Sequence, residues 1–352
     1  MNRWLLRIIA LIPLWLTACS PVYVLRAGYE EAKILSRRRP IVDVMDDPAT
    51  DSTTRRKLDL VLQARTFSDQ QLGLATGESF TTYSWVDSDT LLMVVSGARK
   101  DAFLPYTWSF PIVGRIPYKG FFDFDQAYDL ARDLEAKGYD AHVRPSGAFS
   151  TLGWFNDPLL NTVLRYGDVS LASTVIHELT HNTLFVPSQV GFNESFANFV
   201  GDRGAILFFC TRDGEDAETC RLAQNIWHDN LQFGAFLTEL VAGLEAVYGD
   251  STLTREQKIE RRELVFSSAK ERFRNEVRPT LRTTAFRNFA EQPINNATLI
   301  GTRLYYQHLD WFDALLAQNA GDLRATIRQV EELAANRPDA PFDAVRELIT
   351  AP

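Results

Sequence analysis

Hydrophobic residues follow two different spacings along the chain, and the change of spacing divides the chain into two parts. Between residues 80 and 143, aromatic and β-branched residues form short runs broken by Gly, Pro and Asp, which is typical of strands. From Ser170 onward, apolar residues recur every three or four positions, which is typical of amphipathic helices. The pattern predicts an α+β protein with N-terminal helices and a small mixed sheet, followed by a mainly helical half.

The individual elements follow from where each pattern starts and stops. Before residue 169 we expect helices and strands in alternation: helices over 22–38, 53–73 and 125–137, and strands over 80–85, 91–96, 139–143 and within 110–124. After it we expect long helices over 223–248, 254–276, 296–318 and 321–335. The chain is therefore divided into a leader (1–19), an N-terminal helical and sheet part (20–168) and a mainly helical part (169–352).

The first nineteen residues have the layout of an export signal. Arg3 and Arg7 precede an apolar stretch over 8–16, which is too short to span a bilayer. The stretch ends in Leu-Thr-Ala-Cys, which resembles the bacterial lipobox, so Cys19 is expected to be acylated and to become the mature N-terminus. Ser20 after the cysteine resembles an outer-membrane address. We expect a lipid-anchored protein of the bacterial cell envelope that faces the periplasm; an ordinary cleaved signal is the alternative.

Charge and cysteine content narrow the function further. The net charge is −8 and the only basic cluster is the short run Arg37 to Arg39, so nucleic-acid binding is excluded. Once Cys19 is assigned to the lipid, Cys210 and Cys220 remain, and either a disulfide or two free thiols fit a periplasmic protein. Because there is no Cys-x-x-Cys pair, cysteine is rejected as a metal ligand.

The segment 170–185 carries the sequence His-Glu-Leu-Thr-His on a predicted helix. Its apolar residues fall on one face and His177, Glu178 and His181 on the other. Histidines four residues apart lie one turn apart, so both imidazoles can bind one zinc ion. Glu178 then lies where a carboxylate can take a proton from the attacking water and pass it to the leaving amine. The alternative is a chance match on a solvated helix face.

A third zinc ligand is predicted at Glu194, on the next helical segment. Two histidines and one glutamate leave the fourth position of a tetrahedral zinc site open to water. Ala197 and Gly201 share the face of Glu194, and their small side chains allow this helix to pack closely against the histidine helix. We expect one Zn2+ per chain; a surface role for Glu194 is the alternative.

The order of these motifs resembles two groups of peptidases. HELTH followed by NESFA resembles the gluzincins, whose aminopeptidase N-like members have HExxH followed by NEGFA. Nearly the whole mature chain is similar to a bacterial family of predicted zinc aminopeptidase lipoproteins. This likeness rests on RRRPI at 37–41, the aromatic stretch with KGFF at 110–122, STLGWFNDP at 150–158, FNESFANFVGDRG at 192–204 and NNATL at 295–299. The resemblance implies aminopeptidase activity on peptide substrates.

Two positions depart from the gluzincin pattern. Thermolysin-like enzymes place Asp four residues after the ligand Glu to orient an imidazole, whereas this chain has Asn198, whose carbonyl can still accept the imidazole proton. The Gly-x-Met-Glu-Asn strand that binds the substrate's amino terminus in aminopeptidase N-like enzymes is absent from the sequence. Another anion must then bind the ammonium group, either Asp157 or a carboxylate outside these motifs.

Further candidates lie outside the metal motif. Gluzincins use a Tyr or His to donate a hydrogen bond to the oxyanion, and Tyr305 is the first choice, with Tyr306 and His308 behind it, although a plain core tyrosine fits the pattern equally well. Trp154 and Asp157 precede the metal helix and are expected either to line the cleft or to form a turn packed by aromatics. The two remaining histidines are interpreted as structural or surface residues: His142 and His228.

Three hypotheses follow for the function. The first is hydrolysis of peptides by zinc-activated water, with Glu178 as general base, by an aminopeptidase. The second keeps the same chemistry in an endopeptidase. The third is a catalytically inactive envelope scaffold, and the intact His177, His181 and Glu194 set argues against it. The oligomeric state and the natural substrate are open.

Overall fold

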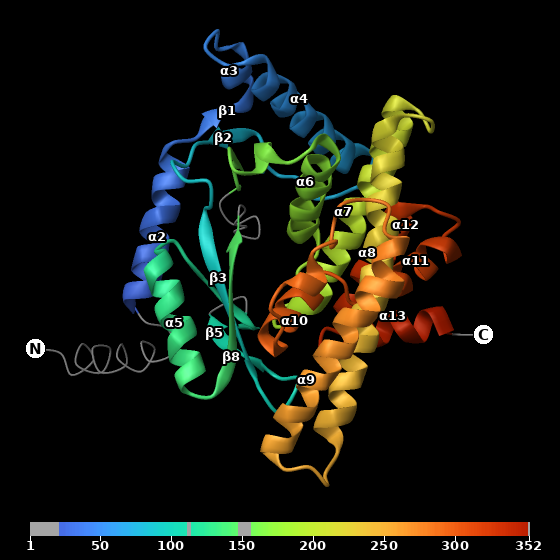
Figure 1. Ribbon diagram of the computed structural model, residues 1–352. Helices are drawn as coiled ribbons and strands as arrows, with labels where there is room; N and C mark the ends of the chain where they lie inside the picture. Colours follow the sequence, from blue (N-terminus) through green and yellow to red (C-terminus); the bar gives the residue numbers. More distant parts are fainter. Residues whose placement is uncertain (1–20, 111–113, 147–155, 351–352) are drawn as a thin grey trace, which may run out of the picture.

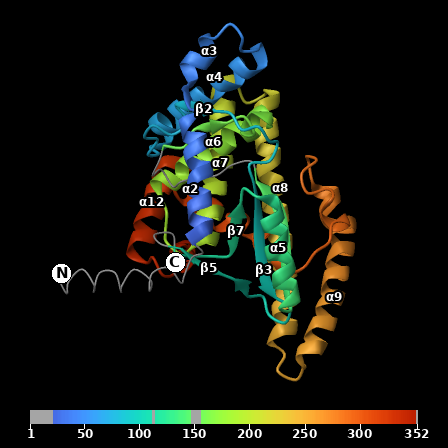
Figure 2. The same ribbon diagram turned by 90° about the vertical axis from the view of Figure 1, so that its left-hand side faces the viewer.

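An antiparallel sheet lies between two groups of helices in this computed structural model, which describes residues 21–110, 114–146 and 156–350 (Figure 1). Helices α2 (Pro21–Ser36) and α5 (Phe124–Ala136) lie on one side of the sheet, and the helices from α6 onward lie on the other. Figure 2 shows the first side facing the viewer. The predicted α+β architecture with a mainly helical second half is confirmed. Cys19 and Trp154 lie outside the described residues.

The central sheet is built around one long strand, β3 (Leu92–Arg99). On one side β3 pairs antiparallel with β8 (Tyr139–Ser146), and on the other with β4 (Pro105–Tyr106) and β7 (Tyr118–Phe121). The remaining strands form two small ladders: β1 (Arg39–Pro40), β2 (Thr82–Ser84) and β9 (Leu159–Leu160) in one, and β5 (Trp108–Phe110) and β6 (Gly114–Ile116) in the other.

The two faces of the central sheet differ in chemistry, because successive residues of a strand point to opposite faces. Met93, Val95 and Phe121 form an apolar cluster with helix α5. The opposite face, toward the helical half, carries polar groups: Ser96 is paired with Tyr118 on one neighbour and with His142 on the other. This second face looks toward the two helices that carry the predicted metal ligands.

The helical half is organised around the hairpin of α6 (Asp168–Thr183) and α7 (Val190–Asp213), most of whose buried apolar residues belong to the largest core cluster. Helices α3 (Ile41–Asp46) and α4 (Ser52–Phe67) belong to the N-terminal part, and α4 packs on α6. The later helices are α8 (Glu218–Gly249), α9 (Arg255–Arg272), α10 (Asn296–Arg303), α11 (Leu309–Gln318), α12 (Leu323–Asn336) and α13 (Pro341–Thr350). No helix among the described residues is long and apolar enough to cross a membrane.

Two links hold the parts together. A buried ion pair joins helix α9 to the sheet: Arg262 Nη1 donates to Asp140 Oδ2 over 2.6 Å and Nη2 to Oδ1 over 3.1 Å, and both residues are 5% exposed. A disulfide between Cys210 and Cys220 joins the end of α7 to the start of α8. The structure thus has the bonded form of the two alternatives that the sequence left open for this pair.

The predicted helix over 296–318 is wrong in its middle. Helix α10 ends at Arg303, a turn covers 304–308, and α11 starts at Leu309. His308 at the end of the turn has φ of +52°, in the left-handed region that interrupts a helix. Apolar spacing continues through this segment, but side chains of α7 bind the backbone of the turn and interrupt the helix. The break matters because Tyr305 lies in it.

Candidate metal centre

Close packing of α7 on α6 brings the two halves of the centre together. An added Cβ at Gly201 would lie 2.8 Å from the carbonyl oxygen of Ser173 and 3.2 Å from Cβ of His177. Gly201 therefore lets the backbone of α7 approach α6 one turn before the first histidine. The loop between the helices is held by Asn193, whose amide both donates to and accepts from the backbone of Val186.

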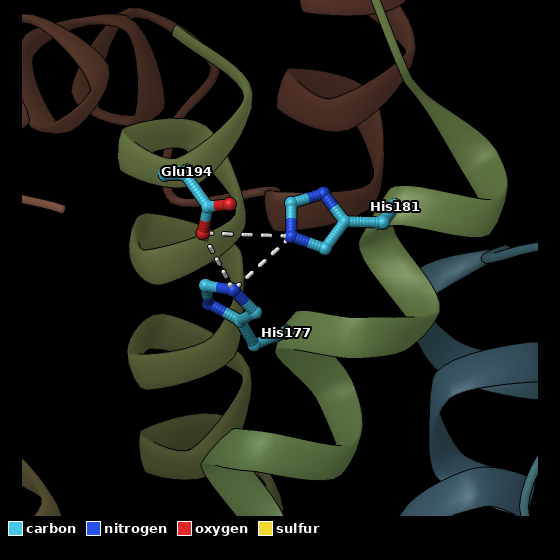
Figure 3. Close-up of side chains that lie close together, drawn as sticks. All are labelled: His177, His181 and Glu194. Carbon is cyan, nitrogen blue, oxygen red and sulfur yellow. Dashed lines mark hydrogen bonds and ion pairs between the residues drawn. The ribbon is translucent and has the colours of Figure 1, made fainter. Parts of the chain in front are cut away.

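The side chains of His177, His181 and Glu194 converge on one point between the two helices (Figure 3). The Nε2 atoms of the two imidazoles are 3.2 Å apart. Oε2 of Glu194 lies 3.4 Å from Nε2 of His177 and 3.7 Å from Nε2 of His181. Each residue therefore offers one donor atom to a common centre.

These donor atoms fit a metal ion. In a tetrahedral zinc site with ligand distances of about 2.0 to 2.2 Å, neighbouring ligand atoms are separated by about 3.3 to 3.6 Å, which is close to the spacing found here. Nδ1 of His181 is buried without a hydrogen-bond partner among the described residues, so the polar contacts of this ring are made through Nε2. Two imidazoles and one carboxylate are also a donor set that zinc accepts.

Burial and mutual attraction set the charges of the three side chains. Burial raises the pKa of Glu194, but its hydrogen bonds with His177 and His181 outweigh that effect and hold the pKa well below its usual range. Burial lowers the pKa of His181, and the neighbouring Glu194 reverses the direction and raises the pKa. Glu194 is therefore ionised at neutral pH and available as an anionic ligand.

Glu178 lies next to the first histidine and has a second carboxylate nearby. Burial raises the pKa of Glu178, the two histidines lower it, and Glu194 and Asp157 raise it. Glu178 and Asp157 also line one small cavity of about 20 Å³, whose apolar wall includes Phe80 and Leu160. This volume holds about one water molecule. The carboxylate of Glu178 and a water-sized space therefore lie together on helix α6, in a cavity that neither imidazole lines.

Tyr305 reaches the centre from the turn between α10 and α11. Its ring centroid lies 6.2 Å from that of His177. Burial raises its pKa strongly, and Glu194 adds to the rise, so the phenol keeps its proton at neutral pH. A protonated phenol beside a candidate metal ligand can donate a hydrogen bond.

Helix α7 fixes the position of this turn. Ser195 Oγ donates to the carbonyl of Leu304 over 2.7 Å and accepts from the backbone N–H of Gln307 over 2.9 Å. Asn198 Nδ2 donates to the carbonyl of Tyr305 over 2.9 Å. Among the described residues, Asn198 makes no hydrogen bond to an imidazole, so here it positions the backbone of Tyr305 instead. The Glu-Ser-x-x-Asn part of the motif thus joins a candidate metal ligand, Glu194, to the turn that carries the phenol.

Sequence reasoning missed two residues of the sheet that face this centre, Tyr118 of β7 and Arg144 of β8. Burial raises the pKa of Tyr118 well above its usual value, Glu194 and Tyr305 raise it further, and Arg144 lowers it, so these groups share one electrostatic environment. Arg144 Nη2 donates to Tyr305 Oη over 3.4 Å. In the sequence, Asp140, His142 and Arg144 alternate with other residues, so they lie on one face of the strand. Only the sheet register shows that this face looks toward the centre.

A buried carboxylate, Asp202, also lies close to the centre and was given no role from the sequence. It accepts hydrogen bonds from Ser173 Oγ over 2.6 Å and from Asn230 Nδ2 over 2.5 Å, which connects α6, α7 and α8. Burial raises its pKa, and the hydrogen bonds and the nearby His177 lower it. Asp202 therefore holds the helices of the centre in place from the side of the first histidine.

The other candidates pack elsewhere. His308 stacks on Trp311 with ring centroids 3.7 Å apart, and Tyr306 packs edge-on against Phe233. His228 lies beside the buried Asp229.

Comparison with known proteins gives one family. The family model described as putative aminopeptidase matches residues 22–342, which is nearly the whole described chain. No curated protein and no solved structure matches the chain. The matched range includes both helices that carry the candidate metal ligands, the sheet and the turn that carries Tyr305.

Proposed function

Because the chain belongs to the putative aminopeptidase family, we propose that it is a zinc-dependent peptidase that removes residues from the amino terminus of short peptides. The observation that carries this proposal is the convergence of His177, His181 and Glu194 at donor spacings of 3.2 to 3.7 Å, with Glu178 beside them. When bound there, zinc supplies a Lewis acid that activates water and polarises the peptide carbonyl.

The protein's own residues then handle the proton and the developing charge. Glu178 takes the proton from the attacking water and delivers it to the leaving amine, and its raised pKa brings it closer to that task than a solvated carboxylate would be. Tyr305 and Tyr118 keep their phenolic protons and donate hydrogen bonds to the carbonyl oxygen as negative charge develops on it.

We propose that the substrate's ammonium group binds on the side of the centre where Glu178 and Asp157 lie. Asp157 is buried and lies close enough to Glu178 to raise its pKa, so a cation placed there would meet negative charge. Trp154 precedes this segment and is proposed to cover the same side of the bound peptide, although it lies outside the described residues. This arrangement favours peptides with a free amino terminus.

Two matched substrates test the proposal. We expect the purified protein to cleave a short alanine peptide from its amino terminus and to lose the activity on treatment with a zinc chelator. The N-acetylated twin, which lacks the positive charge, should be cleaved at least about tenfold more slowly if the charge contributes about 1.4 kcal/mol or more. Equal rates, or internal cuts in the acetylated peptide, would instead support an endopeptidase.

The protein is further proposed to act at the bacterial cell envelope through a lipid on Cys19, with the folded part in the periplasm. The lipobox-like Leu-Thr-Ala-Cys supports this proposal. Two or three acyl chains on one residue would give a stable anchor without a spanning helix. Mass spectrometry of the membrane-extracted protein should find an acylated peptide that begins at Cys19. An unmodified N-terminus on a soluble protein would refute the anchor.

A further inference from the structure

A half-buried cation, Arg144, faces the candidate metal centre without a carboxylate partner among the described residues. Its one side-chain hydrogen bond is the 3.4 Å contact from Nη2 to Tyr305 Oη. Arg262 is paired with Asp140 and Arg203 with Asp313. Arg303, by contrast, also has a buried Nε without a hydrogen-bond partner in the part of the chain that the structure describes. Removing a charge from water without a partner is costly, so an unpaired guanidinium beside a reactive centre indicates a ligand that completes it.

The sheet register directs Arg144 toward the centre. Arg144 pairs with Val94 on β3, and the neighbouring pair Ser96 and His142 places His142 on the same face of β8. Tyr118 pairs with Ser96 from the other side of β3, so Tyr118 and Arg144 stand diagonally across one strand. Apolar residues of the opposite face are covered by α5. The guanidinium and the two phenols therefore share the face of the sheet that looks toward the metal-binding helices.

The field of Arg144 reaches the phenols. Burial raises the pKa of Tyr118 and of Tyr305, whereas the charge of Arg144 lowers both. Burial lowers the pKa of His142, and Arg144 lowers it further. The positive charge of Arg144 therefore lies close to both phenols. The negative charge of Asp157, in contrast, raises the pKa of Glu178. Arg144, which has no carboxylate partner among the described residues, thus places a positive charge on the phenol side of the centre, whereas Asp157 acts beside Glu178 and Asp202 beside His177.

We propose that Arg144 binds a carboxylate group of the substrate and so makes the site selective for short peptides with a free carboxyl terminus. This inference rests on the proposed peptidase function. A guanidinium fork binds a carboxylate through two parallel N–H···O bonds, and Arg144 has such donors left after its single bond to Tyr305. A peptide offers a carboxylate at its C-terminus or on an Asp or Glu side chain. Because the group is the same, Arg144 is expected to bind either one.

Binding measured without turnover tests this proposal directly. In the Glu178→Gln background, calorimetry compares trialanine with trialanine amide, which differ only in the terminal charge. We expect trialanine to bind at least about tenfold more tightly, and Arg144→Gln to remove that advantage by weakening trialanine roughly ten- to a hundredfold while the amide changes little. Arg144→Lys should keep part of the preference, because it keeps the charge and loses the fork.

Two further measurements show which carboxylate of the peptide binds and whether the effect is specific to Arg144. An amidated peptide with one glutamyl side chain that recovers the Arg144-dependent affinity would assign the site to an acidic side chain. Arg132→Gln is the matched control, since it removes an arginine whose side chain is 67% exposed on α5, and it should change nothing. Melting temperatures of all variants check the fold.

Two results would overturn the proposal: equal affinity of the wild-type site for acid and amide, or an equal loss for both in Arg144→Gln. The second would mean that Arg144 acts on a part common to both peptides. If the proposed peptidase function is wrong, the measurements give a different combination of results. In that case the carboxylate preference remains in calorimetry, and the protein with wild-type Glu178 cleaves neither peptide. Cleavage of both peptides at equal rates with equal affinity removes the role of Arg144 alone.

Discussion

Gly201 of helix α7 faces the backbone carbonyl of Ser173 on helix α6 so closely that a Cβ at position 201 would lie 2.8 Å from that oxygen. Real Cβ atoms essentially never come this close to a backbone atom, so any side chain must push the two helices apart. The two helices carry the three candidate metal ligands. The spacing of the donor atoms therefore depends on the absence of one methyl group.

Gly201→Ala is expected to weaken metal binding and to destabilise the fold by about 1 to 3 kcal/mol, the usual cost of overpacking. Calorimetric zinc titration and urea unfolding measure the two effects. Gly243→Ala is the matched control on α8, because its added Cβ would meet Val265 at an ordinary 3.4 Å. This control should be neutral or gain up to about 1 kcal/mol from helix propensity. Equal behaviour of the two variants would show that the helix approach is not critical.

Removing the phenolic hydroxyls should lower turnover without removing the metal. For Tyr305→Phe we expect a loss in kcat of about a hundredfold, the usual effect of deleting one oxyanion donor. Tyr118→Phe should show the same kind of loss if both phenols contact the substrate oxygen. Steady-state kinetics together with zinc analysis gives the answer. An unchanged kcat in either variant would show that the hydroxyl of that tyrosine does not contribute to turnover and that the residue only packs in the core.

Ser195→Ala tests whether the turn of Tyr305 is held by helix α7. The substitution removes two hydrogen bonds to the turn, one donated to Leu304 and one accepted from Gln307, and leaves a buried carbonyl and an N–H unpaired. We expect a loss of about 1 to 3 kcal/mol in the free energy of unfolding and a lower kcat. Because Ser195 touches no metal ligand through these bonds, zinc content should stay the same. Loss of zinc would mean that the variant disturbs the helix itself.

The ion pair of Arg262 and Asp140 should be essential for docking helix α9 on the sheet. Arg262→Ala leaves the Asp140 carboxylate buried, and breaking such a pair costs about 3 to 5 kcal/mol. The midpoint of urea unfolding measures the loss. Arg261→Ala is the neighbouring control, since its contact with Asp250 is 3.9 Å long at the surface and should be worth at most about 1 kcal/mol. Similar losses would contradict the special position of the buried pair.

Much of the candidate centre could be predicted from sequence because its chemistry is local. Helical spacing alone puts His177 and His181 on one face, and the next helix supplies Glu194 a short loop later. Gly201 could be predicted as a close-packing position for the same reason. The division of the fold into a sheet and a helical half also follows from the change of hydrophobic period.

The rest depends on contacts between distant residues, which hydrophobic periodicity does not record. Tyr118 and Arg144 meet the centre only through the pairing of β7 and β8 with β3. The break at residues 304–308 arises because Ser195 and Asn198 bind its backbone, while its own apolar spacing continues as in a helix. The role of the NNATL segment also depends on distant residues: Asn296 Nδ2 donates to the carbonyl of Arg99 over 2.8 Å and connects α10 to the sheet.

Zinc content and turnover measured together in two variants test the central claim most directly. Protein purified without chelators should contain about one zinc ion per chain, and His181→Ala should lose both the metal and the activity, because it removes a ligand. Glu178→Gln keeps the shape of the side chain but cannot accept the water's proton, so it should retain zinc while turnover falls at least about a hundredfold. Wild-type protein without a bound transition metal, or near-normal turnover in Glu178→Gln, would contradict the account.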